Sequence, residues 1–291
     1  MTLRWIVLAI VAAVVAAAVI NFLPDQAPGQ ASLVRIAMPP WTTSPPPTYV
    51  AKAMLEDLYG LSVAIEETDV GVAWQSVANG DIDLLVDAWL PNLHANYLEA
   101  HRDNVEILGE PLYQGADLGW AVPAYVPADS VEDLKDESIA AMCNRRVIGI
   151  DPGAGMMRVS QQVLEAYDLD WELVEGSEFA MLTALDDAVR NRECIVFLAW
   201  RPHFMFAQHD LKFLEDPLGL WTRDNAVKVA RRGFSEDFPG PARLLGRWRL
   251  PIEDVEQMIN EIEVNGRPPE EVAGEWVAAN RDRIRAWQEA D

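Results

Sequence analysis

The chain has 291 residues, half of them hydrophobic, and carries a formal net charge of −23. This length suffices for two compact α/β lobes or one large domain, and the apolar content excludes a wholly disordered chain. The acidic field repels nucleic acid and anionic membrane surfaces and attracts cations, so nucleic acid is not an expected partner.

An apolar run from Trp5 to Leu23 follows a single basic residue, Arg4. At about nineteen residues, the run falls between a long signal-peptide core and a minimal membrane span. Residues 1–24 are therefore predicted to be a signal peptide or an N-terminal membrane anchor, and residues 25–32 a linker. Cleavage, at Ala27 or Ala31, is preferred over a retained anchor. Both alternatives export the rest of the chain, and the absence of a closely following cysteine excludes a lipoprotein anchor.

Strands and helices then alternate. The proline-rich segment from Pro39 to Pro47 is expected to exclude regular structure until a helix begins near Thr48. Gly60 and Gly80 are helix stops. This βαβαβ order predicts a parallel sheet covered by helices. The expected elements are strand Leu33–Met38, helix Tyr49–Tyr59, strand Ser62–Glu66, helix Gly71–Ala78 and strand Ile82–Ala88.

A second α/β set follows, and a mainly helical tail begins near Val227. Two successive sets predict two lobes, lobe 1 comprising residues 33–122 plus 225–291 and lobe 2 residues 123–224. Ligands of open α/β sheets bind at the carboxyl ends of strands, which between two lobes means the cleft. The expected strands are Leu118–Pro123, Val147–Asp151, Trp171–Glu175, Ile195–Ala199 and Val227–Arg231. The expected helices are Val131–Lys135, Met156–Tyr167, Glu178–Asn191, His203–Gln208, Pro241–Leu245, Ile252–Glu263 and Pro269–Glu289.

The two cysteines, Cys143 and Cys194, each precede a predicted strand. If these strands are neighbours, the sulfurs can pair in an oxidising compartment; the alternative is two buried free thiols. No residues show metal-ligand spacing, and no metal or cofactor is expected.

Four of the eleven tryptophans lie where core packing does not require an indole. Trp41 lies in the proline-rich loop, Trp89 and Trp200 each end a buried strand shortly before a proline, and Trp248 lies between two helices. Indoles at the cleft edges of both lobes can surround a quaternary ammonium group, which is bound mainly through cation–π attraction. The other tryptophans are expected in the core or in loops.

Three stretches form a recognisable set: GDIDLLVDAWLPNLH at 80–94, GIDPGAG at 149–155 and AWRPHFMF at 199–206, the last followed by DLKFLEDP at 210–217. Together they resemble the glycine betaine and proline betaine substrate-binding proteins of ABC importers. The resemblance implies a two-lobed, type II periplasmic-binding-protein-like α/β fold, an extracytoplasmic location, a permease partner and no catalysis. It implies a cage of Trp89, Trp200 and Trp248, with Trp41 on a nearby loop. It also implies that the amides of Thr43 and Ser44 hold the ligand's carboxylate.

Other polar residues near these motifs have structural alternatives. His203 is a candidate to orient a loop or touch a carboxylate, against a packing role at a helix start. Asp87 and His94 are interpreted as structural, and the glycine-rich turn at 151–155 as turn geometry rather than an anion site.

Two other functions are alternatives, an exported enzyme and a membrane-anchored sensing module. An exported enzyme is disfavoured because no Gly-x-Ser-x-Gly elbow occurs. A membrane-anchored sensing module would have the same fold. Among ligands, choline, carnitine and sulfonium osmolytes remain alternatives, since the family segment after the first strand usually has an acidic residue where this chain has Thr42-Thr43-Ser44.

Overall fold

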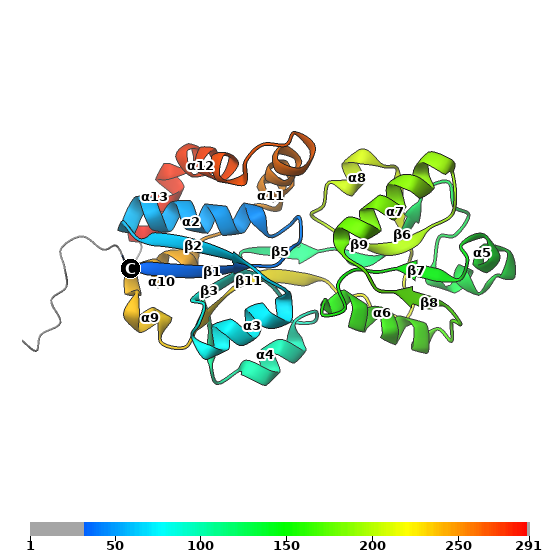
Figure 1. Cartoon of the computed structure of the whole chain (residues 1–291), viewed down its shortest axis with the longest axis horizontal. Helices are drawn as coiled ribbons and strands as arrows, with labels where there is room; N and C mark the ends of the chain where they lie inside the picture. The colour runs from blue at the N-terminus through cyan, green and yellow to red at the C-terminus, as the bar shows by residue number, and fades with distance from the viewer. Residues whose placement is uncertain (1–31, 290–291) are drawn as a thin grey trace, which may run out of the picture. The chain divides into compact units, whose positions relative to one another are not determined.

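A computed structural model describes residues 32–289 of the chain, which contain two β-sheets flanked by helices (Figure 1). The predicted signal peptide or anchor lies outside these residues. None of the described helices is long and apolar enough to cross a bilayer. The two-sheet α/β architecture agrees with the predicted fold class.

The first sheet has the strand order β2-β1-β3-β11-β4, with β5 also paired to β11. Strands β1, β2 and β3 are parallel, whereas β11 runs antiparallel to β3. We call this sheet and its helices the first lobe. Its strands are β1 (Leu33–Met38), β2 (Ser62–Glu67), β3 (Leu84–Leu90), β4 (Val105–Ile107), β5 (Tyr113–Ala116) and β11 (Asp224–Arg231). Its helices are α2 (Pro45–Tyr59), α3 (Val70–Asn79), α4 (Ala95–His101), α9 (Phe234–Asp237), α10 (Pro239–Arg247), α11 (Ile252–Ile259), α12 (Pro269–Ala279) and α13 (Arg281–Glu289).

The second sheet, with the order β10-β6-β9-β7-β8, forms the second lobe. Strands β7, β8 and β9 are parallel, and β6 is antiparallel to β9 and β10. Its strands are β6 (Leu118–Pro123), β7 (Arg146–Ile148), β8 (Glu172–Val174), β9 (Val196–Trp200) and β10 (Leu211–Phe213). Its helices are α5 (Glu137–Met142), α6 (Gly155–Ala166), α7 (Glu178–Asn191) and α8 (Met205–Gln208), preceded by a 3₁₀ turn at Val131–Lys135.

The boundary between the lobes falls earlier than the predicted residue 122. Strand β5 still belongs to the first sheet, but β6 pairs with β9 and β10 of the second. The chain therefore crosses at Asp117 and returns between β10 and β11. The prediction assigned β6 to the wrong lobe because strand order along the chain does not reveal strand partners.

Helix α2 begins at Pro45, three residues before the predicted start at Thr48. Three consecutive prolines form its first turn. This is allowed because the first amides of a helix have no acceptor within it, and the fixed φ of proline already suits a helix. At the other end of the chain, the single helix predicted for 269–289 is divided at Asn280 into α12 and α13.

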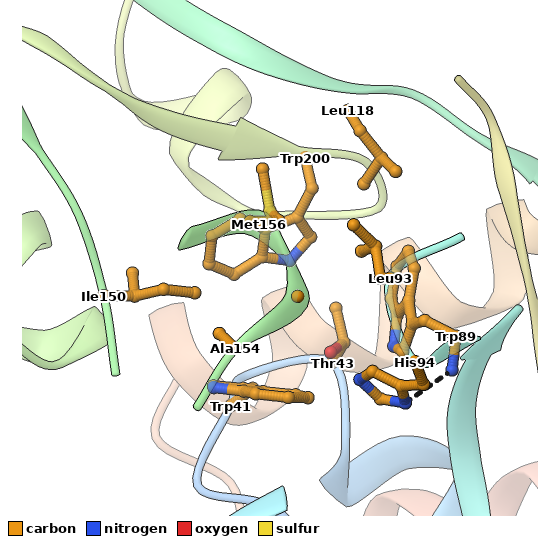
Figure 2. A pocket seen from close by; sticks show the side chains of 11 residues that line it. Trp41, Thr43, Trp89, Leu93, His94, Leu118, Ile150, Ala154, Met156 and Trp200 are labelled. Atoms are coloured by element: carbon orange, nitrogen blue, oxygen red, sulfur yellow. Dashed lines mark hydrogen bonds between the residues drawn. The ribbon is translucent and has the colours of Figure 1, made fainter. Parts of the chain in front are cut away.

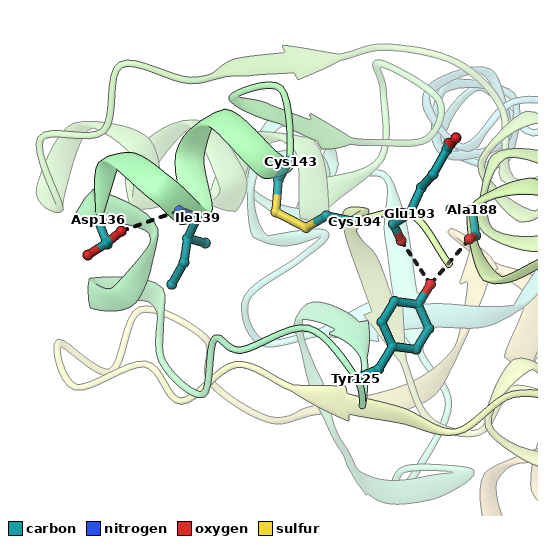
Figure 3. Close-up of a disulfide and its surroundings, with 7 residues drawn as sticks. All are labelled: Tyr125, Asp136, Ile139, Cys143, Ala188, Glu193 and Cys194. Atoms are coloured by element: carbon teal, nitrogen blue, oxygen red, sulfur yellow. Dashed lines mark hydrogen bonds between the residues drawn. A yellow bond between two sulfur atoms is a disulfide. The ribbon is translucent and has the colours of Figure 1, made fainter. Parts of the chain in front are cut away.

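Cys143 and Cys194 form a disulfide, with their Cα atoms 4.8 Å apart (Figure 3). The strands that follow them, β7 and β9, are neighbours, as the paired alternative required, and Val147 is in register with Val196. Nearby, the Tyr125 hydroxyl donates to the carbonyl of Glu193 at 2.8 Å. The disulfide thus fixes the loop that enters β9 at the end opposite Trp200.

Candidate ligand-binding site

A small cavity lies between the two lobes. Residues of both lobes contribute to its wall, as Figure 2 shows. The lining residues from the first lobe are Trp41, Thr43, Trp89, Leu93 and His94. Those from the second lobe are Leu118, Ile150, Ala154, Gly155, Met156 and Trp200.

Two of the three predicted cage indoles, Trp89 and Trp200, meet in this cavity together with Trp41, which was predicted on a nearby loop. Trp89 and Trp200 are carried by β3 and β9 and are 3% and 4% exposed. Trp41 enters from the loop after β1, and its indole N–H donates to a carboxylate oxygen of Asp151 in the second lobe at 3.2 Å. Each lobe therefore supplies indole surface, as the strand-edge pattern predicted.

Trp248 does not line the cavity. It follows α10, its side chain is fully buried, and its carbonyl accepts a hydrogen bond from Lys228 Nζ at 3.1 Å. The sequence placed Trp248 correctly between two helices. However, a tryptophan in a connection can face either the cleft or the interior, and this one is in the interior of the first lobe.

His94 presents a neutral hydrogen-bond donor to the cavity. Its Nδ1 accepts from the backbone N–H of Trp89 at 3.0 Å and is 3.4 Å from the indole nitrogen of Trp74. Because Nδ1 is an acceptor, the ring proton is on Nε2. Burial first, and the charge of Arg158 second, lower the pKa of His94 to about 3. The sequence interpretation of His94 as structural did not include this position in the cavity wall.

The start of α6 provides further donors. Ala154, Gly155 and Met156 line the cavity, and the first amides of a helix have no acceptor within it. Together with the helix dipole, such amides favour an anion. The sequence interpretation had left the 151–155 turn as simple turn geometry. The signal was present, because a glycine-rich turn before a helix exposes several amides at once.

The predicted carboxylate donors Thr43 and Ser44 behave differently from each other. Thr43 lines the cavity, whereas Ser44 does not, and the Ser44 amide already donates to the carbonyl of Trp41 at 3.0 Å. Both hydroxyls donate to Asp87 Oδ2, at 3.3 Å from Thr43 and 2.9 Å from Ser44. The Ser44 amide is therefore not available to a ligand.

His203 lies behind the cavity wall rather than in it. Its ring packs edge-on against Trp200, with centroids 4.8 Å apart and an interplanar angle of 82°. Its Nδ1 accepts from the Met205 amide at 3.0 Å, which caps the start of α8. Of the two predicted roles, the structure supports orientation of the Trp200 loop.

The wall thus combines aromatic faces with hydrogen-bond donors. Its lining includes no carboxylate, lysine or arginine. Within residues 32–289, no group of His, Cys, Asp and Glu side chains has an arrangement that could hold a metal ion. The indoles suit a dehydrated cation, while His94 Nε2 and the α6 amides suit an acceptor such as a carboxylate. The arrangement can bind a small molecule that carries both groups.

Comparison with known families gives one model that matches residues 32–279: the substrate-binding domain of ABC-type glycine betaine transport systems. The glycine betaine/carnitine transport binding protein GbuC of Listeria monocytogenes is 34% identical over 165 residues, 55% of this chain and 53% of that protein. The chain therefore matches about half the length of this relative. The glycine betaine/proline betaine-binding periplasmic protein of Escherichia coli is 22% identical, over 76% of this chain and 78% of the relative.

Solved structures show the same likeness. Lactococcal OpuAC in its closed conformation with glycine betaine has a TM-score of 0.82 and 34% identity, covering 89% of this chain and 100% of that one. An ABC-transporter choline-binding protein in complex with choline has a TM-score of 0.79 and 26% identity, covering 88% of this chain and 91% of that one.

Proposed function

Because the chain belongs to the family of substrate-binding domains of ABC-type glycine betaine transport systems, we propose that its own ligand is a betaine, a small zwitterion with a quaternary ammonium and a carboxylate. The protein is a binding protein for import and not an enzyme. The observation that carries the proposal is the cavity wall, which combines three indoles from two lobes with a neutral imidazole and the start of a helix.

The donor end of the cavity favours a betaine over choline. A carboxylate can accept hydrogen bonds from His94 Nε2 and from the α6 amides at the same time, whereas a hydroxyl offers less acceptor capacity and no charge for the helix dipole. A donor left unpaired in a closed cavity costs binding energy. Choline remains the second candidate because a structural neighbour at 26% identity has choline bound.

Binding between two lobes supports delivery to a permease by lobe closure. Besides the indoles, the lobes are joined by the Tyr97 hydroxyl, which donates to the carbonyl of Gly153 at 2.7 Å, by Arg158, which donates to the carbonyl of Asn92 at 2.7 Å, and by further contacts described below. A ligand that contacts both lobes stabilises the closed form by its differential contacts. We propose that an importer recognises this form.

We place the protein outside the cytoplasmic membrane. Related proteins are named as periplasmic, and the predicted apolar run at the N-terminus would direct export. Whether the run is cleaved separates a free binding protein from a membrane-anchored sensing module with the same fold. N-terminal sequencing of the mature protein decides between them.

The test is to titrate the purified protein with glycine betaine, choline and proline, and to measure binding by tryptophan fluorescence and by calorimetry. Saturable binding of glycine betaine, weaker binding of choline and none of proline are expected. Trp89→Ala should weaken betaine binding about tenfold or more, because one cation–π contact is lost in a dehydrated site.

His94→Asn tests the carboxylate end. Asn retains an acceptor near the position of Nδ1 but removes the Nε2 donor, so it should weaken betaine binding about tenfold and leave choline binding nearly unchanged. A wild-type protein that binds no quaternary ammonium or sulfonium compound would refute the proposed ligand class and leave the fold unaffected.

A further inference from the structure

Glu178 is a buried carboxylate that does not line the cavity and yet joins the two lobes. It is the first residue of α7 in the second lobe and is 3% exposed. From the first lobe it accepts two hydrogen bonds, from the Thr42 amide at 3.1 Å and from Thr42 Oγ1 at 2.7 Å. From its own lobe it accepts one, from His203 Nε2 at 2.8 Å.

These partners are direct neighbours of two cavity indoles. Thr42 follows Trp41 in the loop after β1, and His203 packs edge-on against Trp200. His203 Nδ1 accepts the Met205 amide, so Nε2 holds the proton that is donated to Glu178. Glu178 thus ties the loops of Trp41 and Trp200 together across the cleft.

The three hydrogen bonds differ in what happens when the lobes separate. The bond from His203 lies within the second lobe and persists in an open form, whereas both bonds from Thr42 cross the cleft and are lost. A carboxylate withdrawn from water is costly unless donors replace the water. The closed form supplies these donors from Thr42, and an open form returns the carboxylate to solvent.

We propose that Glu178 is a positioning residue that locks the lobes in the closed form and thereby sets how long the ligand is held. This rests on the proposed function, because the lock matters for a ligand that is enclosed between the lobes. Glu178 lines a second pocket beside Trp41 and Thr42 but not the cavity of the three indoles, so its effect on affinity passes through the closure equilibrium. Ligand entry occurs before closure and is independent of the lock.

The experiment compares stopped-flow binding of glycine betaine to the wild type, Glu178→Ala, Thr42→Val and the double variant. Glu178→Ala should raise the Kd about tenfold to a hundredfold, as expected for two lost hydrogen bonds to a charged group. The change should appear as a faster dissociation rate with the association rate unchanged. The double variant should be no weaker than Glu178→Ala, because Glu178→Ala already removes the hydroxyl contact that Thr42→Val deletes.

Asp186→Ala is the matched control. Asp186 lies on the same helix and accepts from a histidine, His209, at 2.7 Å, but both residues belong to the second lobe. Its removal deletes a carboxylate–histidine pair that is more exposed than that of Glu178 and does not cross the cleft, so betaine kinetics should stay at the wild-type values. An effect equal to that of Glu178→Ala would overturn the lock and indicate a general role of α7.

Several outcomes count against the lock. An unchanged Kd in Glu178→Ala, a loss confined to the association rate, or additive losses in the double variant would each overturn it. Thermal unfolding checks that each variant folds. If Glu178→Ala does not fold, Thr42→Val still tests the lock.

Small-angle scattering of the ligand-free protein separates the lock from the proposed function. A larger radius of gyration for Glu178→Ala than for the wild type supports the lock even if no betaine binds. Equal radii, with no betaine binding to the wild type, would reject both proposals.

Discussion

Asp87 places a carboxylate directly behind the cavity wall. It lies on β3, is 1% exposed, and accepts hydrogen bonds from the hydroxyls of Ser44 at 2.9 Å, Tyr113 at 3.2 Å and Thr43 at 3.3 Å. Thr43 lines the cavity, and Trp89 follows two residues later on the same strand. Burial raises the pKa of Asp87, while the three hydroxyls act in the opposite direction. A cation in the cavity would favour the ionised form.

Asp87→Asn should therefore weaken binding of a cation-bearing ligand more than binding of an isostere that lacks the cation. The suitable pair is glycine betaine and 3,3-dimethylbutyrate, which has the same carboxylate but a tert-butyl group in place of the trimethylammonium. We expect about a tenfold loss for glycine betaine, the order of one charge interaction of about 1.4 kcal/mol at an intermediate dielectric. Calorimetry of both ligands measures the difference.

The pH dependence gives the sign of the same effect. Because burial raises the pKa of Asp87, this carboxyl group is protonated at a higher pH than an exposed one. The preference for glycine betaine over 3,3-dimethylbutyrate should therefore decrease as the pH is lowered. Asp87→Asn should show no such dependence. Equal losses for both ligands in the variant would mean that Asp87 only supports Thr43 and Ser44.

At the residue scale, the sequence predicted the indoles better than the polar groups. Trp41, Trp89 and Trp200 follow or end buried strands, and chain direction alone places such residues at the cleft edge. Trp248 lies between helices, where no such rule fixes the direction of a side chain. The donor role of His94 depends on which ring nitrogen accepts the Trp89 amide, and that contact is set by the folded loop.

At the element scale, helix α6 begins at a point of close contact between the lobes. A Cβ atom built on Gly155 would collide with the backbone carbonyl of Leu93 in the first lobe. The φ angle of Gly155 is not positive, so its own helix would accept another residue. The glycine is therefore required by the approach of the two lobes and not by the conformation of α6.

Gly155→Ala should fold normally and bind glycine betaine at least tenfold more weakly. Alanine is favoured in helices and keeps the amide that can face the ligand, so the loss would report incomplete closure. Gly176→Ala is a matched control, since its Cβ would find its nearest contact at 3.7 Å within the second lobe. Calorimetry and thermal unfolding measure both variants, and wild-type affinity in Gly155→Ala would contradict this role of the contact.

The order of the larger elements was predictable, and the smaller ones were not. Strands β4, β5 and β10 have three or four residues each, too short for a readable alternation of apolar side chains. The start of α2 was missed because a run of prolines usually excludes a helix, although its first turn tolerates them. The membership of β6 depended on strand pairing, which local sequence does not encode.

At the scale of the whole molecule, the protein is strongly acidic, with 46 acidic and 23 basic residues. Like charges repel within a compact structure and destabilise it, and salt screens this repulsion. An acidic binding protein for an osmolyte should consequently be more stable at the ionic strength at which osmolytes are needed. The sequence alone supports this expectation, because it depends on net charge and not on particular contacts.

Raising NaCl from about 0.05 M to 0.5 M, which shortens the Debye length from above about 10 Å to well below it, should raise the Tm.

The same change in salt concentration separates the two ligand candidates. Glycine betaine has no net charge, so its association rate should stay nearly constant, whereas choline is a net cation that the acidic field attracts and should associate more slowly in salt. Thermal scans and stopped-flow titrations at matched salt concentrations measure both effects. A Tm that falls with salt would show that specific ion pairs outweigh the net repulsion, and a steep salt dependence for glycine betaine would contradict the behaviour expected of a ligand with no net charge.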